Sequence, residues 1–156
     1  RANTQWRSID GVAALVLFPI TDGYVSPSSY PSKTEHGRVM PNWNYEVVHV
    51  HGTVQIHDDA EWLREVVTDL TDRHEAARSV EPPWAVTDAP GDFIDRQLRA
   101  IVGIEVRTES IEGKRKLSQN RSDADRLGVA ASLASSPHRR DQEVAEAMGR
   151  LPDAPS

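Results

Sequence analysis

Apolar and polar positions alternate most regularly between Tyr45 and His57. Residues of like parity share one face of an extended chain, and the even positions from 48 to 56 carry three valines and an isoleucine around Gly52. This pattern predicts a strand over 45–57. A glycine on the apolar face of a strand is typical of a bulge or a bend, which we expect at Gly52.

Two further segments have strand character. The continuous apolar run Val12–Phe18 predicts a strand that is buried on both of its faces. Turn-forming residues at 21–23 then predict a hairpin, whose returning strand begins at Tyr24. The alternation over Val102–Ile111 predicts a half-exposed strand that ends in a turn at 112–113.

Helical spacing follows the alternating strand in two places. Asp58, with Glu61 three residues later, predicts a capping box for a helix that ends near Arg78. Asp88 is the predicted N-cap of a shorter helix. The buried side of this shorter helix is expected to carry four residues, Phe93, Ile94, Leu98 and Ile101.

The C-terminal segment is predicted to form two helices. Ser122 and Asp125 predict a capping box for a helix to about residue 133, and Ser136 is the predicted N-cap of a helix over 137–149. A helix-turn-helix is the alternative, but Glu143 and Glu146 would oppose DNA phosphates, so a helical hairpin packed on a sheet is favoured. Because strands and helices are mixed without regular alternation, the predicted fold class is α+β.

Composition narrows the classes of protein that the chain can belong to. It has 156 residues with 38% hydrophobic and 27% charged side chains, which is ordinary for one globular domain. The net charge of −6 argues against a broad nucleic-acid surface, and no apolar run is long enough to predict a membrane span. The absence of cysteine excludes disulfides and thiolate chemistry and fits a reducing cytoplasm.

Two polar clusters are candidates for ligand binding. Residues 23–45 combine four serines, Lys33 and four aromatic rings, a set that suits a phosphate and a planar group, although it is also typical of a proline-rich surface loop. Basic and amide side chains at 114–121 precede a predicted helix start and suit an anion. Asp123 and Asp125 weaken that second interpretation, and a solvated hairpin with a helix cap is the alternative.

No catalytic residue and no metal ligand set is assigned. His49 and His51 alternate on one face of the predicted strand, but two imidazoles make an incomplete metal site. The chain contains neither a nucleophile elbow nor a glycine-rich phosphate loop. A binding protein is therefore favoured over an enzyme.

Several segments resemble a known family in content and in order. They are YVSPSSYPSK, PNWNYEVVHVHGTV, PWAVTDAP, IVGIEVRTESIEGKRKLSQNRSDADRLGV and EVAEAM. Together they are similar to the PaiB-type family of FMN-binding negative transcriptional regulators. The resemblance implies a split β-barrel of the flavin-reductase and pyridoxamine-phosphate-oxidase kind, which forms homodimers and binds FMN in a cleft between subunits. On this basis residues 1–121 are the split-barrel domain, and residues 122–156 are a C-terminal helical hairpin and tail packed on the barrel.

The resemblance also implies which residues hold the cofactor. Ser32 and Lys33 would bind the FMN phosphate, although Pro31 precedes the serine where the related oxidases have a Ser-Arg-Lys element. The flavin would be bordered by three neighbours, Trp43, Asn44 and Tyr45. Gln119 and Arg121 would make a second, weaker contribution. Family members have a helix and their first barrel strands ahead of the segment resembling RANTQW, so strand 12–18 or a neighbour is expected to have an unpaired or partner-covered edge.

The expected function is that of a cytoplasmic, homodimeric FMN-binding regulator. A flavin-dependent oxidoreductase is the first alternative, because the cofactor itself carries the electrons and few protein groups are needed. A haem-binding barrel that uses His49 or His51 is the second. Direct DNA binding is the least supported part of the expectation, because the chain is acidic and the helical hairpin is poor in basic residues.

Overall fold

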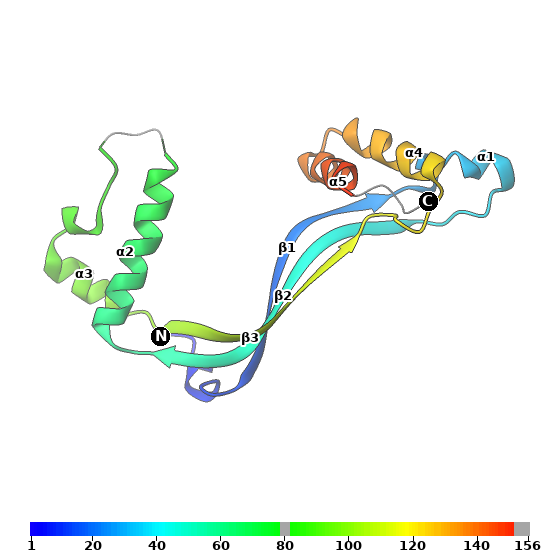
Figure 1. Ribbon diagram of the computed structural model, residues 1–156. Helices are drawn as coiled ribbons and strands as arrows, with labels where there is room; N and C mark the ends of the chain where they lie inside the picture. The colour runs from blue at the N-terminus through cyan, green and yellow to red at the C-terminus, as the bar shows by residue number, and fades with distance from the viewer. Residues whose placement is uncertain (79–81, 152–156) are drawn as a thin grey trace. The chain divides into compact units, whose positions relative to one another are not determined.

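The computed structural model describes residues 1–78 and 82–151, which form an α+β protein with a three-stranded antiparallel sheet (Figure 1). The strands, in sheet order, are β1 (Ala13–Val25), β2 (Asn42–His57) and β3 (Gly103–Lys116). The helices of this part of the chain are α1 (Ser32–His36), α2 (Ala60–Ala76), α3 (Gly91–Leu98), α4 (Asp123–Ala134) and α5 (Arg139–Gly149). Short 3-10 turns lie at Gln5–Ser8, Pro27–Ser29 and Val86–Asp88. The predicted α+β class is confirmed.

The chain divides into two compact units. Unit 1 comprises Arg1–Ala14 and His51–Glu109, and unit 2 comprises Leu15–Val50 and Ser110–Ser156. Each of the three strands contributes residues to both units. Residues 152–156, which belong to the expected tail, lie outside the described residues. None of the described helices has the length and apolar character needed to cross a bilayer.

Unit 1 is built around a small core beneath α2 and α3. Leu63, Val86, Ile94 and Leu98 are buried together. The predicted helix after the alternating strand is confirmed, but its N-cap is Asp59, whose carboxylate accepts a hydrogen bond from the Trp62 amide at 2.8 Å. Asp58, the predicted cap, is instead paired with Arg1.

The prediction for α3 is correct in position and wrong in detail. Asp88 does not cap this helix, because its carboxylate accepts a hydrogen bond from the Ala85 amide at 2.9 Å and closes the preceding turn. Phe93 and Ile101 are 44% and 40% exposed, so only two of the four predicted core positions of this helix are buried.

Two predictions for β1 are wrong. The strand continues through residues 21–23, where a hairpin turn was predicted, because Gly23 lies under α5. A Cβ atom at Gly23 would lie 3.2 Å from Asp141 Oδ1 and 3.3 Å from Val144 Cγ2, so the glycine lets the helix approach the strand. The apolar run is not buried on both faces, because Leu17 and Phe18, which point to opposite faces of β1, are 55% and 51% exposed.

The expected edge position of the first strand is observed, since β1 has β2 on one side and, within the described residues, no strand on the other. The predicted strand over 45–57 is confirmed and begins three residues earlier, at Asn42. The turn predicted at 112–113 is wrong, because β3 continues to Lys116. Its last residues stay paired with β2, where Arg115 Nε lies 2.6 Å from Glu46 Oε1.

Unit 2 has the larger core, which the helices α4 and α5 form with the ends of the strands (Figure 1). Its most deeply buried residues include Val25, Tyr30, Leu117, Val129 and Val144. The predicted cap of α4 is confirmed, since Ser122 Oγ accepts a hydrogen bond from the Asp125 amide at 3.3 Å.

The predicted cap of α5 is wrong. This helix begins at Arg139, with His138 in the N-cap position. Ser136 acts just before the helix, where its hydroxyl donates a hydrogen bond to Asp141 Oδ2 at 2.6 Å and accepts one from the His138 amide at 3.2 Å.

Candidate functional site

The predicted flavin-bordering residues lie at the start of β2, in unit 2, on opposite faces of the sheet. The period-two geometry of a strand places Trp43 and Tyr45 on one face and Asn44 and Glu46 on the other. Trp43 is 49% exposed, whereas Asn44 is fully buried and Glu46 is 6% exposed. The three predicted residues are therefore divided between two faces. We call the face of Trp43 and Tyr45 the open face and the face of Asn44 and Glu46 the covered face.

The open face carries aromatic rings and cations. The Tyr24 and Trp43 rings lie 6.2 Å apart at an angle of 58°, and the Trp43 indole Nε1 donates a hydrogen bond to Asp22 Oδ2 at 2.9 Å. On β3 the ammonium groups of Lys114 and Lys116 lie 5.7 and 5.9 Å from the centre of the Tyr45 ring. Aromatic rings can stack on a planar ligand, and neighbouring ammonium groups can bind its anionic group.

Asn44, on the covered face, is committed to the protein interior. Its Oδ1 accepts a hydrogen bond from Ser118 Oγ at 3.1 Å, and its Nδ2 lies 3.6 Å from the Met148 sulfur, which accepts the other bond. Ser118 adopts a left-handed φ of 63°, which is uncommon for a residue other than glycine. Asn44 thus joins β2 to the end of β3 and to α5.

Ser32 is likewise engaged within unit 2. Its hydroxyl donates a hydrogen bond to Asp125 Oδ2 at 2.8 Å, and its amide donates one to Asp125 Oδ1 at 3.1 Å. Burial raises the pKa of Asp125, but the two bonds from Ser32 and the charges of Arg121 and His36 outweigh it and hold that pKa below its ordinary value. The carboxylate is therefore ionised at neutral pH, and its negative charge beside Ser32 opposes a phosphate at that hydroxyl.

The remaining predicted site residues have separate environments. Lys33 is exposed on α1, and its ammonium donates a hydrogen bond to Ser28 Oγ at 3.3 Å. Gln119 folds back on the chain, where its Oε1 accepts from the Leu117 amide at 2.6 Å. The Arg121 guanidinium lies 5.0 Å from the centre of the Tyr30 ring. The buried Arg121 Nε and Tyr30 hydroxyl have no hydrogen-bond partner in the described part of the chain.

The structure brings together only part of the predicted site. Trp43 and Tyr45 share the open face, whereas within residues 1–78 and 82–151 no hydrogen bond, ion pair or ring contact joins them to Ser32 or Lys33. His49 lies in unit 2 and His51 in unit 1, both at partly buried positions of β2.

Sequence reasoning missed a cavity of about 750 Å³ that is lined by residues of β1, of β2 and of the segment at the start of α5. Its lining includes two aromatic residues and two arginines, Tyr24, Trp43, Arg139 and Arg140. The Arg-Arg pair is visible in the sequence, but nothing in its local pattern places it beside the first strand. Asp22 makes that link, because its Oδ1 lies 3.2 Å from Arg140 Nη1.

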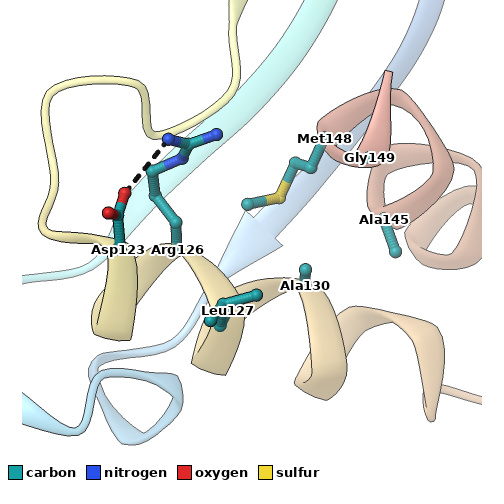
Figure 2. A pocket seen from close by; sticks show the side chains of 7 residues that line it. All are labelled: Asp123, Arg126, Leu127, Ala130, Ala145, Met148 and Gly149. Carbon is teal, nitrogen blue, oxygen red and sulfur yellow. Dashed lines mark hydrogen bonds and ion pairs between the residues drawn. The ribbon is translucent and has the colours of Figure 1, made fainter. Parts of the chain in front are cut away.

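A second cavity, of about 500 Å³, lies between α4 and α5 (Figure 2). Figure 2 shows Leu127 and Ala130 on α4 facing Ala145 and Met148 on α5, with the Asp123–Arg126 ion pair at one side. No predicted site residue lines it. Its surface is mainly apolar, which makes it a poor match for a phosphorylated ligand.

The chain is thus an α+β protein whose open face combines aromatic rings with ammonium groups. Residues 1–110 match the model of a family described as "Putative FMN-binding domain". Because the match covers well over half of the chain, the chain belongs to this family of FMN-binding domains, the family of the PaiB-type regulators. The predicted family is confirmed.

Three curated relatives match the chain. The chain is 29% identical to the protease synthase and sporulation protein PAI 2 of Bacillus subtilis, over 94% of the chain and 67% of that protein. It is 32% identical to an uncharacterized protein of Emericella nidulans over 85% of the chain, and 35% identical to one of Aspergillus fumigatus over 68%. The chain spans 56% and 46% of these two fungal proteins, about half of their length.

Proposed function

We propose that this chain binds FMN as part of a homodimeric split-barrel protein that acts as a negative transcriptional regulator. The observation that carries the proposal is the open face of β2 and β3, which combines aromatic rings with the ammonium groups of Lys114 and Lys116 in a chain of the FMN-binding family. The name of the Bacillus relative, a protease synthase and sporulation protein, supports a regulatory role.

The donor set of the open face fits FMN. Trp43 and Tyr45 would contact the isoalloxazine ring, and the two lysines of β3 would attract the phosphate. When bound, FMN supplies a redox-active ring system. Asn44 would hold the ring-bearing strand in place from the covered face, through Ser118 and Met148.

The other predicted residues enter the proposal in supporting roles. Lys33 is the competing candidate for the phosphate, because it is exposed and its ammonium has no acidic partner among the described residues. Ser32 would organise α1 by binding Asp125. Gln119 and Arg121 would order the segment that leads from β3 into α4.

Titration of the purified chain with FMN tests the cofactor and its phosphate partner together. We expect quenching of flavin fluorescence by the neighbouring rings, with saturation at one FMN per chain. The double variant Lys114→Ala/Lys116→Ala should weaken FMN binding by about tenfold, because two charge-assisted contacts are lost. Lys33→Ala is the matched control and should change the affinity by less than about twofold.

The reverse order of effects would move the phosphate site to Lys33. Absence of any FMN binding by a folded chain would contradict the proposed function itself.

The exposed apolar residues of β1 support the homodimer and the barrel. Leu15, Leu17, Phe18 and Ile20 are each 49% to 59% exposed on an edge strand. An apolar edge of this kind is usually covered by another element or by a partner chain. We infer that a second copy covers it, within the cytoplasm, a compartment that suits a chain without cysteine.

Phe18→Lys tests the proposed dimer, because a charge in a buried interface has a large desolvation cost. Sedimentation equilibrium should show a dimer for the unmodified chain and a monomer for the variant. Leu127→Lys, at an apolar position of α4 that is 71% exposed, is the matched control and should remain dimeric. A monomeric unmodified chain would contradict the dimer and leave FMN binding as a separate result.

A further inference from the structure

A cavity lies beside the start of α5. Of the predicted site residues, Trp43 alone lines this cavity. Tyr24 and Trp43 form one part of its lining, and each residue is 49% exposed, so part of each side chain is accessible to a ligand. Its volume of about 750 Å³ is within the range of small-molecule pockets and is sufficient for a mononucleotide. The ring pair is ready to stack against a planar group.

The part of the lining that belongs to the start of α5 presents accessible positive charge. The Arg139 and Arg140 side chains are 90% and 78% exposed, whereas that of Asp22 is 32% exposed. Asp22 already accepts hydrogen bonds from the Trp43 indole at 2.9 Å and from Arg140 at 3.2 Å. Asp141 accepts one from Ser136 at 2.6 Å. Both arginines are paired as well, since Arg139 Nε lies 2.9 Å from Glu143 Oε1, but their exposure leaves their other N–H groups accessible to a ligand.

The two parts of the lining are held together by the packing of α5 on β1. The absence of a side chain at Gly23 allows Asp141 and Val144 to approach the strand closely. Thr21 adds a hydrogen bond from its hydroxyl to the Arg140 carbonyl oxygen, at 3.4 Å. All of these residues belong to unit 2.

We propose that this groove is a binding site for a planar aromatic anion of about mononucleotide size. Its ring binds against Tyr24 and Trp43, and its anionic group binds toward Arg139 and Arg140. Two sources have this chemistry, FMN itself and a second aromatic anion that binds independently of the flavin. The site includes α5, which lies outside the residues that match the FMN-binding family model.

The experiment compares three probes on the full chain by calorimetric titration, namely FMN, adenosine 5′-monophosphate and inorganic phosphate. The test variants are Tyr24→Ala and Arg139→Ala/Arg140→Ala. Arg73→Ala/Arg96→Ala is the matched control, because these exposed arginines pair with Asp69 on α2 and Asp92 on α3 one helical turn away, as Arg139 pairs with Glu143 on α5. Each test variant should weaken the bound aromatic probe by about tenfold, and the control by less than about twofold.

A loss confined to adenosine monophosphate supports a second site, and a loss of FMN affinity supports the groove as the flavin site. If the chain does not bind FMN but binds adenosine monophosphate through the two arginines, the groove is supported and only the proposed function is contradicted. As a second readout, the indole N–H resonance of Trp43 should shift when the aromatic probe is added.

Three results would overturn the inference. The first is that both test variants bind the aromatic probe with unchanged affinity. The second is that inorganic phosphate binds as tightly as adenosine monophosphate. The third is that the Trp43 resonance does not shift with any of the probes.

Discussion

Residues that are neighbours in sequence on β2 have different environments on the two faces of this strand in unit 2. On the covered face, Asn44 is fully buried and hydrogen-bonded to Ser118 and Met148. On the open face, Trp43 keeps about half of its surface exposed, and Tyr45 lies beside two lysine ammonium groups. The comparison shows that a contiguous motif can serve two purposes, because the pleat of a strand sends alternate side chains to opposite faces.

Asn44→Ala should give the largest effect. It removes both hydrogen bonds of the amide and leaves the buried Ser118 hydroxyl without its acceptor. We expect a loss of about 3 kcal/mol in the free energy of unfolding, measured by urea denaturation. Trp43→Ala is the control on the other face and should cost less than about 1 kcal/mol. Similar losses for the two variants would remove the distinction between the faces.

Trp43→Ala should weaken FMN binding by about tenfold, because a stacking surface for the ring is lost. Trp43→Phe should retain most of the affinity, since it keeps an aromatic ring on the open face. The measurement is quenching of flavin fluorescence in a chain whose circular dichroism spectrum is unchanged. Equal affinities of Trp43→Ala and the unmodified chain would place the flavin elsewhere.

Ser32→Ala tests whether Ser32 has a structural role. We expect a smaller loss in the free energy of unfolding than for Asn44→Ala, and a loss that depends on pH. The pKa of Asp125 is depressed in the folded chain, so its contribution to stability is present above the ordinary value near 3.8 and is lost as the pH falls through the folded pKa. Without the Ser32 hydroxyl this pKa should rise toward its ordinary value, and acid unfolding should begin at a higher pH. The free energy of unfolding between pH 2 and pH 7 measures the change.

If Ser32→Ala reduced FMN affinity and left the acid transition unmoved, the hydroxyl would belong to the ligand site. At neutral pH the variant should also lose some stability, because Asp125 stays charged and keeps only the bond from the Ser32 amide.

Errors in the prediction of β1 show where local reasoning fails. Asp22 and Gly23 are turn-forming residues by type, yet both lie inside a strand. Asp22 accepts hydrogen bonds from Trp43 and Arg140, and the absence of a side chain at Gly23 allows α5 to pack close to the strand. These are contacts between residues far apart in the chain, so no window of neighbouring residues contains them.

The sequence by itself determined the α+β class, the long alternating strand, the helices α2 and α4 with the cap of α4, and the family. Each of these depends on periodicity or on residues within a few positions of one another. Only the tertiary structure decided that Ser32 binds Asp125 and that Arg139 and Arg140 lie beside Tyr24. The physical reason is that the distance between elements is set by how their side chains pack, which depends on the whole of unit 2.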